Sequence, residues 1–406
     1  MKIRSIVVTP YHIFRRLLAK FWLLVHLDVE VIGVTGSYGK TNTSAAITSV
    51  LSEKFKTLQT DLNLDTNFNI PITILRLGNH EKLVLEYGID HVGEMEKHLS
   101  LAKPKIAVIT GISPVHADDE HLGSLEKIIA EKSKLVQAVS KEDWVVLNYD
   151  DTNVRRIKQA LDKKTIFYGT SSKYCDVWAS NIKVDYKGTA FNLHVNTTKL
   201  PSSKNTIKVS TPLLGTQGVS NCLAAAAVGL IEHLSLDEIV SGLSKLKPLE
   251  GRLNVEAGPK GSVLLNDSRR SNPASAIAGL QTFKDLTAKR KIAILGEMGE
   301  LGKYSEEGHR SVGKKVAEIK PDYLVCVGEQ TDFIADEAKK KMKKDSIIFA
   351  RDVFEAAGAL SGILQKGDLI YLKGSLLKHV ERIIRLLEGK EVDPDEIAFH
   401  RYEIYH

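Results

Sequence analysis

The stretch Val31-Ile-Gly-Val-Thr-Gly-Ser-Tyr-Gly-Lys-Thr-Asn-Thr43 decides the fold of this chain. It joins an apolar run, which is typical of a buried strand, to a glycine-rich loop, and residues 41–54 then carry apolar side chains on one helical face. A strand, a glycine-rich loop and a helix in this order predict a phosphate-binding loop. The loop amides and the helix N-terminus would bind phosphates, Lys40 would add a positive charge, and the Thr41 hydroxyl would reach Mg²⁺. The sequence therefore predicts a nucleoside triphosphate site.

One position departs from the generic pattern of such loops. The usual spacing puts a glycine where Val34 stands, whereas the glycines flank it at positions 33 and 36. The alternative interpretation is a glycine turn that happens to contain a lysine. We favour the phosphate loop, because its glycines and its lysine fall between the expected strand and the expected helix. The residues predicted to contact the nucleotide here are Gly36, Ser37, Gly39, Lys40 and Thr41.

The composition of the 406 residues is ordinary for a soluble globular protein. The net charge of +6 is spread along the chain, so we interpret the basic clusters at 289–291 and 339–344 as solvated surface and expect no nucleic-acid partner. The cysteines at positions 175, 222 and 326 are odd in number and far apart, which predicts neither a disulfide framework nor a zinc site. A reducing cytoplasm fits this composition best.

An apolar run at residues 11–27 is interrupted by Arg15, Arg16 and Lys20. It is too short and too charged to span a membrane, and no small-residue cleavage site follows it. Its apolar side chains recur at helical spacing, which leaves two interpretations. The helix either touches the inner membrane face or another partner as a peripheral element, or it packs on the nucleotide-binding domain. We favour the packed helix, since amphipathic helices mostly serve cores.

The rest of the chain predicts two α/β domains. Strands and helices alternate over residues 31–248, which favours a P-loop domain with a mainly parallel sheet covered on both faces. Residues 174–209 alternate polar and apolar side chains and predict a small antiparallel appendage. We expect residues 1–30 to form a short helical extension, 31–248 the central ATP-binding domain, 249–389 a Rossmann-like C-terminal domain and 390–406 a tail. The predicted strands are 83–86, 105–110, 144–147, 165–168, 263–266, 291–295, 323–327 and 369–372, and the last predicted helix is 375–388.

Two polar side chains end neighbouring strands of the predicted sheet. Glu86 closes an apolar strand, and the next strand leads to His116. Ligands of parallel sheets bind at the carboxyl ends of the strands, and a carboxylate there can hold Mg²⁺. Taken singly, Glu86 is more typical of a capping or surface residue, and His116 of a polar loop residue. Their shared place beside Thr41 favours a joint interpretation as metal ligands.

The helix expected at residues 124–135 carries Lys127, Lys132 and Lys134. A solvated helical face accounts for all three lysines. Spacing alone therefore does not distinguish Lys132 from its neighbours.

A series of short motifs in a fixed order resembles the Mur ligase family, and within it the type that adds D-alanyl-D-alanine in peptidoglycan synthesis. The resemblance extends from about residue 31 to 389. The usual N-terminal uridine-binding domain of the family is not matched. The motifs are residues 35–41, 85–88, 91–94, 102–109, 114–116, 123–126, 147–151, 214–221, 251–252, 272–273, 295–302 and 373–375.

The resemblance implies that the nucleotide is ATP, and that Lys40 and the loop amides hold its β- and γ-phosphates. Thr41 and Glu86 would bind one Mg²⁺, and His116 would bind a second. Lys132 matches a family lysine that is carbamylated, a change that turns a cation into a carboxylate-like group near the metals. Lys40, His116 and Lys132 are the residues we expect to act in catalysis.

The resemblance also assigns residues outside the metal cluster. Asn221 would contact adenine, and Arg252 and Asp267 would approach the nucleotide from the C-terminal domain. The residues expected at the substrates are Asn63, Thr66, Asn67, Arg269, Asn272, Lys373 and Ser375.

The implied reaction is amide formation through an acyl phosphate. A carboxylate of the acceptor attacks the γ-phosphate and releases ADP, and an amino acid or dipeptide amine then expels phosphate. Closure of the C-terminal domain would keep water from the acyl phosphate. The function predicted from the resemblance is an ATP-dependent, cytoplasmic ligase that acts on a cell-wall precursor.

Three departures leave the acceptor and the amine open. Only 32 residues precede Gly33, so we expect the uridine-binding domain to be absent or reduced to the helix at 11–27. Arg269 stands where the D-glutamate-adding type has a lysine, and Gln217 and Asn69 replace a usual histidine and a common glycine. A folylpolyglutamate-synthase-like or other amino-acid ligase is one alternative. A non-catalytic nucleotide-binding subunit of a partner is another.

Overall fold

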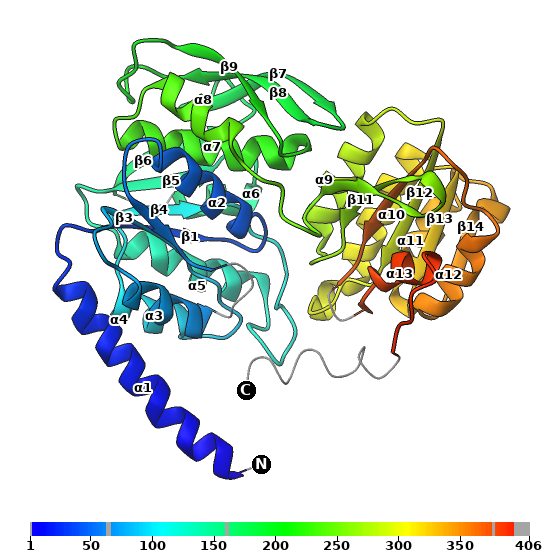
Figure 1. Ribbon diagram of the computed structural model, residues 1–406, viewed down its shortest axis with the longest axis horizontal. Coiled ribbons are helices and arrows are strands. Elements are labelled where there is room, and N and C mark those ends of the chain that lie inside the picture. The colour runs from blue at the N-terminus through cyan, green and yellow to red at the C-terminus, as the bar shows by residue number, and fades with distance from the viewer. Residues whose placement is uncertain (1, 62–65, 159–161, 376–377, 394–406) are drawn as a thin grey trace.

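The computed structural model describes residues 2–61, 66–158, 162–375 and 378–393. Its strands form two separate sheets, each with helices on both faces, and the two layered units lie side by side (Figure 1). We refer to the unit built on the first sheet as the first lobe and to the other as the second lobe. The switch between sheets falls between Ser244 and Asn254, which is where the sequence predicts a domain boundary. The exact bounds of the predicted domains stay a prediction.

The first lobe contains a nine-stranded sheet in the order β2-β3-β1-β4-β5-β6-β7-β8-β9. Strands β1 to β7 are parallel to one another. Strands β8 and β9 continue the sheet in antiparallel fashion. The strands are β1 (Glu30–Thr35), β2 (Thr57–Gln59), β3 (Lys82–Glu86), β4 (Ile106–Ile109), β5 (Trp144–Asn148), β6 (Lys164–Gly169), β7 (Val177–Asp185), β8 (Gly188–Val195) and β9 (Thr206–Thr211).

Helices cover both faces of this sheet, because successive apolar side chains of its strands point to opposite faces and each face needs a cover. In β3, Val84 packs on the face of α2, α7 and α8, whereas Leu83 and Leu85 pack on the opposite face with α3 to α6. The helices are α1 (Lys2–Leu24), α2 (Lys40–Leu51), α3 (Thr66–Leu75), α4 (Glu94–Leu101), α5 (Leu125–Ala138), α6 (Thr152–Lys158), α7 (Gly215–Ile231) and α8 (Leu236–Ser244).

The second lobe has a six-stranded sheet in the order β10-β11-β15-β12-β13-β14, parallel except for β10. Helices α9, α10 and α11 cover one face and α12 and α13 the other. The strands are β10 (Asn254–Ala257), β11 (Val263–Asp267), β12 (Arg290–Gly296), β13 (Tyr323–Val327), β14 (Ile347–Ala350) and β15 (Asp368–Lys373). The helices are α9 (Pro273–Asp285), α10 (Ser305–Ile319), α11 (Asp332–Ala338), α12 (Val353–Ser361) and α13 (Arg382–Leu387), with 3-10 turns at η1 (Pro259–Gly261), η2 (Gly302–Tyr304), η3 (Glu329–Thr331) and η4 (Lys344–Ser346).

The predicted α/β class and mainly parallel sheets are confirmed, and two details differ. Residues 174–209 pair in antiparallel fashion, as predicted, but they continue the main sheet instead of forming an appendage. Asp176 helps to join β6 to β7: its amide donates to Phe167 O at 2.7 Å, and its carboxylate accepts from Phe167 N at 2.9 Å. The predicted helix at 375–388 is shortened to α13. His379 has a φ of 46°, a left-handed conformation that cannot belong to a right-handed helix.

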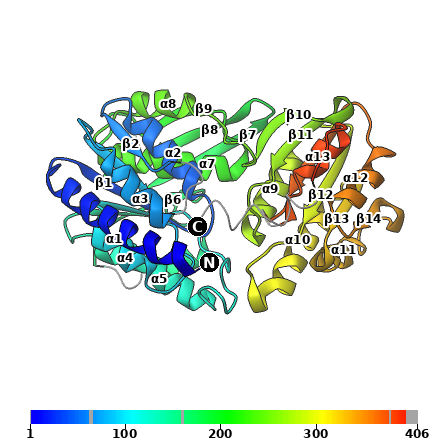
Figure 2. The same cartoon turned by 60° about the horizontal axis from the view of Figure 1, so that its bottom comes forward.

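The N-terminal run forms α1, which packs on α3 and α4 through the side of the helix that carries Ala19 and Trp22 (Figure 2). The structure thus contains the packed helix that we favoured from the sequence. No helix in the described part of the chain is both long enough and apolar enough to cross a membrane.

Helices α2 and α8 approach so closely that a glycine is required between them. An added Cβ at Gly242 would lie 2.6 Å from Val50 Cα and 2.8 Å from Ser49 O, and both atoms belong to the backbone. We expect Gly242→Ala to lower the free energy of unfolding by about 1–3 kcal/mol in urea titrations. Gly358→Ala in α12 is the control, since nothing lies within 4 Å of that position, and should gain up to about 1 kcal/mol. Equal stability of the two variants would contradict this packing.

Candidate active site

The phosphate loop turns from β1 into α2 beneath the loop that follows β4. Ser37 N donates to Gly111 O at 2.7 Å, and an added Cβ at Gly36 would lie 2.1 Å from Thr110 Oγ1. Gly39 has a φ of 78° and no side chain with which to cap α2. The first amides of α2 therefore have no side-chain cap, which is the arrangement in which helix N-termini can bind anions.

Lys40 lies over this loop beside the predicted metal ligand Glu86. Its ammonium donates to Gly36 O at 3.0 Å and lies 3.9 Å from Glu86 Oε1. Burial lowers the pKa of Lys40 to about 8, although Glu86 opposes this, and the charges of Arg270 and Arg252 lower the pKa further. Two arginines of the second lobe thus act on the phosphate loop of the first.

We expect the protein without nucleotide to become more stable as the pH rises from 8 to 10. The pKa of Lys40 is about 8 in the folded protein against an ordinary value of 10.5, so in this range the unfolded state binds more protons. Lys40→Met should raise the free energy of unfolding at pH 7 by about 2 kcal/mol and reduce the slope with pH. Urea titrations at several pH values measure both, with Lys366→Met at an exposed site as the control. An unchanged slope in Lys40→Met would contradict the lowered pKa.

Lys132 is buried, contrary to the solvated face that its helix suggests. Its side chain is 2% exposed on α5, and no hydrogen bond or ion pair joins it to another residue of the described ranges. Burial lowers the pKa of Lys132 well below its ordinary value, and the charge of Lys40 adds to this against the opposing charge of Glu86. The structure therefore brings a buried amine with a lowered pKa to the side of Lys40 and Glu86.

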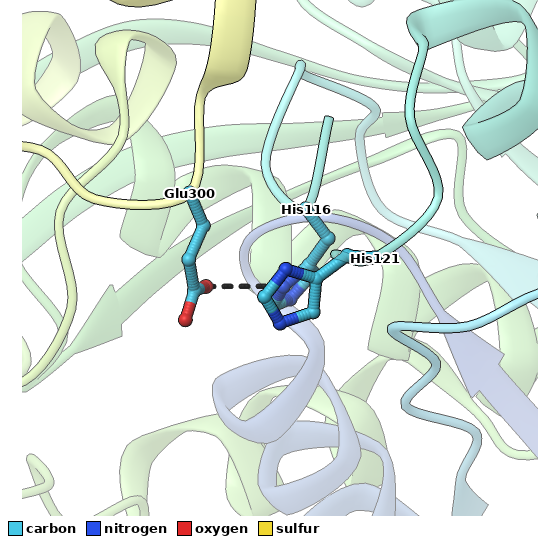
Figure 3. A group of neighbouring side chains, drawn as sticks. All are labelled: His116, His121 and Glu300. Carbon is cyan, nitrogen blue, oxygen red and sulfur yellow. Dashed lines mark ion pairs between the residues drawn. The ribbon is translucent and has the colours of Figure 1, made fainter. Parts of the chain in front are cut away.

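His116 meets the second lobe at a cluster that also contains His121 and Glu300 (Figure 3). His116 Nδ1 lies 3.0 Å from Glu300 Oε2, and the rings of His116 and His121 are 5.2 Å apart between centroids. Ala117 N also donates to Glu300 O at 2.9 Å, so the backbones of the two lobes touch here. Burial lowers the pKa of His116, although Glu300 opposes this.

The loop that carries Glu300 is anchored by His309. Met298 N donates to His309 Nε2 at 3.0 Å, and His309 Nδ1 donates to Ser305 O at 2.7 Å. This pair of bonds requires the neutral ring, and burial lowers the pKa of His309.

The second lobe presents Arg252, Arg269 and Arg270 to the first. Burial lowers the pKa of Arg252, which also senses the charges of Glu86 and the other two arginines. Behind them, Lys373 Nζ donates to Asp267 Oδ2 at 2.7 Å and to Arg270 O at 2.9 Å. Asp267 and Lys373 therefore pair with each other and support the arginine loop.

Other predicted site residues make local bonds. Asn221 accepts from Thr43 Oγ1 at 3.0 Å, while its own amide nitrogen is buried without a partner in the described residues. Asn272 caps α9, and Ser375 N donates to Glu297 O at 3.0 Å. Thr66 Oγ1 donates to Gly88 O at 2.7 Å and Asn67 Nδ2 to Glu94 Oε1 at 3.0 Å, whereas Asn63 lies outside the described residues.

Comparisons with known proteins agree with this architecture. The model of the Mur ligase middle domain matches residues 34–229, and that of the Mur ligase, glutamate ligase domain matches residues 251–376. A UDP-N-acetylmuramoyl-tripeptide–D-alanyl-D-alanine ligase of Bacillus subtilis (strain 168) is 32% identical over 370 residues, which are 91% of this chain and 78% of the relative. The chain belongs to the Mur ligase family. It is an ATP-dependent, ADP-forming ligase of the kind that acts in peptidoglycan synthesis.

Two solved Mur ligases have a similar structure. MurF from Acinetobacter baumannii superimposes with a TM-score of 0.82 at 26% identity, over 93% of this chain and 81% of that one. MurF from Thermotoga maritima, solved in complex with ADP, gives a TM-score of 0.78 at 24% identity, over 93% and 84% of the two chains, and supports the fold alone.

Three residues that complete the site of this Mur ligase escaped the sequence analysis. His121 follows His116 by five positions, and Glu300 lies in the motif at residues 295–302, which we noted only for its resemblance to the family. Arg270 adjoins Arg269, and its charge reaches Lys40 and His116. Only the approach of the two lobes distinguishes these residues from ordinary loop residues.

Proposed function

We propose that this Mur ligase joins D-alanyl-D-alanine to a UDP-N-acetylmuramoyl-tripeptide, with MgATP as the source of energy. The relatives above carry this activity in their names. The observation that carries the proposal is the meeting of Lys40, Glu86 and Lys132 with arginines of the second lobe. These groups suit a site where a carboxylate attacks a phosphate.

The residues present fit magnesium. The carboxylate of Glu86 ends β3 beside Lys40, and Thr41 follows Lys40 at the start of α2. Carboxylate and hydroxyl oxygens are the donors that Mg²⁺ prefers. Thr41 and Glu86 would hold one ion and His116 a second, and the ions would neutralise the phosphate charge.

Lys132 suits the proposed carbamylation. Carbon dioxide reacts with a neutral amine: the nitrogen lone pair forms a bond to carbon, one C=O π bond opens to place its electron pair on oxygen, and one proton leaves to the solvent. Burial lowers the pKa of Lys132, which favours the neutral amine that this reaction needs. The resulting carbamate would carry a negative charge toward the metals and would relieve the unpaired state of the lysine.

In the first step, the C-terminal carboxylate of the tripeptide attacks the γ-phosphorus, and the bond to the β-phosphate oxygen breaks to release ADP. Lys40 and the amides from Gly36 to Thr41 hold the phosphates, and Arg252 and Arg270 face them from the second lobe. The positive charges and the closed approach of the lobes stabilise the transferred group and exclude water.

In the second step, the amine of D-alanyl-D-alanine attacks the acyl carbon, loses a proton and expels phosphate. We propose that Thr66 and Asn67, at the start of α3, face the acceptor and that Arg269 offers a charge for a carboxylate. Asn272, Lys373 and Ser375 would support the second-lobe side of this region. Because the proposed reaction uses ATP and a UDP-linked acceptor, we propose that it takes place in the cytoplasm.

A panel assay of phosphate release tests the proposal. The purified chain is given ATP with UDP-N-acetylmuramoyl peptides and D-alanyl-D-alanine, D-glutamate, a diamino acid, or folate with glutamate. We expect release only with the tripeptide and D-alanyl-D-alanine, and its loss in Lys40→Ala. Turnover with folate would favour the folylpolyglutamate alternative, and ATP binding without turnover would favour a non-catalytic subunit; either result overturns the proposal.

A further inference from the structure

Helix α1 is fixed on the first lobe by one of its faces. Ala19 is fully buried, Trp22 Nε1 donates to Leu77 O at 3.0 Å, and the Arg16 guanidinium donates to Lys97 O at 2.6 Å. These contacts hold the helix across α3 and α4, so that its other face points away from the lobe (Figure 2).

The outward face of α1 is apolar and exposed. Residues 11–27 hold nine of the fourteen exposed large apolar side chains among the described residues, so exposure is concentrated here. Six of them repeat at helical spacing and form one continuous strip, which we call the α1 stripe: Phe14, Leu17, Leu18, Phe21, Leu24 and Val25. Their exposed fractions run from 41% to 65%, and a strip of this size marks an interaction surface.

The charged side chains of residues 1–27, which include α1, are all basic. Residues 1–27 contain five lysines and arginines and no aspartate or glutamate. Helical spacing puts Lys20 on one border of the stripe. The guanidinium of Arg15 lies 5.5 Å from the centres of the Tyr11 ring and of the Phe68 ring in α3, so Arg15 lies on the side of α1 that faces the lobe.

The charge distribution selects the occupant of this surface. A second copy of the chain would bring the same basic residues against the first, with no acidic residue of α1 to pair with them. A bilayer with anionic lipids supplies both an apolar interior and the opposite charge. A basic helix with one apolar face lies in the plane of such a surface and does not cross it.

We propose that α1 docks this protein on a membrane surface that contains anionic lipids, with the α1 stripe among the upper acyl chains and with Lys20 at the head groups. The docked helix would hold the first lobe against the bilayer through α3 and α4. This proposal rests on α1 alone and does not depend on which substrates the ligase uses.

Vesicle flotation of the full chain tests the proposal. We expect the protein to float with vesicles of phosphatidylcholine and phosphatidylglycerol (7:3), and to bind vesicles of phosphatidylcholine alone at least tenfold more weakly. Phe14→Ser/Phe21→Ser should weaken binding to the anionic vesicles by about a hundredfold, because each exposed phenylalanine loses its apolar burial. Lys20→Gln should weaken it about fivefold, an effect that high salt removes.

The control is Phe349→Ser/Phe354→Ser, which replaces two exposed phenylalanines of the second lobe and should float like the parent. All replaced residues are exposed, so thermal melting should show that the variants stay folded. Absence of the parent from both kinds of vesicle would overturn the proposal. So would unchanged flotation of Phe14→Ser/Phe21→Ser, or a concentration-dependent dimer that this variant abolishes. Ligase activity is not the readout, so failure here leaves the proposed reaction untouched.

Discussion

Lys132→Met is expected to make the protein more stable and nearly inactive. The lysine is 2% exposed, and within the described ranges no hydrogen bond or ion pair offsets the loss of water from its amine. Methionine fills a similar volume without a polar nitrogen. We expect the free energy of unfolding to rise by about 1–3 kcal/mol, measured by urea titration.

The activity of Lys132→Met should fall by about a hundredfold or more in the phosphate-release assay. Under the proposed mechanism the carbamate of Lys132 steadies the metal ions, and methionine cannot form it. Lys127→Met on the exposed side of the same helix is the matched control and should keep both stability and activity. Full activity of Lys132→Met would contradict the proposed catalytic role of Lys132. A lower free energy of unfolding would contradict the inference that the buried amine destabilises the protein.

Gly302→Ala is expected to remove most of the activity while each lobe stays folded. Gly302 has a φ of 53°, and an added Cβ would lie 2.8 Å from both Ala117 O and Asp118 Cα in the other lobe. Because both atoms belong to the backbone, the lobes must separate. The contact of Glu300 with His116 would be lost, and Arg252 would withdraw from Glu86. A displacement of about 1 Å can cost about a hundredfold in rate.

Gly367→Ala separates this effect from simple backbone strain. Gly367 has a φ of 86°, but nothing lies within 4 Å of its added Cβ. In both variants the left-handed backbone conformation of the new alanine should lower the free energy of unfolding by about 1–2 kcal/mol, so their melting temperatures should fall by similar amounts. Only Gly302→Ala should lose activity and show a larger radius of gyration in small-angle scattering. Full activity in Gly302→Ala would show that the contact between Gly302 and Ala117 is dispensable.

The sequence predicts that Lys40 and Glu86 lie close together because neighbouring parallel strands end at the same edge of the sheet, and the structure confirms this proximity. The loop at Lys40 and the strand end at Glu86 follow from an apolar strand that stops at a polar residue. The short edge strands β2, β10 and β14 were not predicted. Strands β2 and β10 have three and four residues of mixed polarity, and β14 is apolar but only four residues long, so none of them carries a clear period.

The remaining site residues could not be found from local pattern. Lys132 has the spacing of a solvated lysine, and only the packing of α5 on the sheet buries it. Glu300 and Arg270 lie more than 150 positions from His116 along the chain, so their roles depend on how the two lobes meet. His116 and Glu300, which lie where the two lobes touch, both have a left-handed backbone conformation. This conformation can be recognised only in the structure.

His309 makes the loop that carries Glu300 sensitive to acid. A proton on Nε2 would replace the acceptor of the Met298 amide by a second donor, and the loop to Glu300 would lose its anchor. Burial lowers the pKa of His309, so the neutral ring survives into mildly acidic solution and fails below it. A protonated His309 would therefore release the loop that carries Glu300, and acid would weaken the contact between the two lobes at this loop.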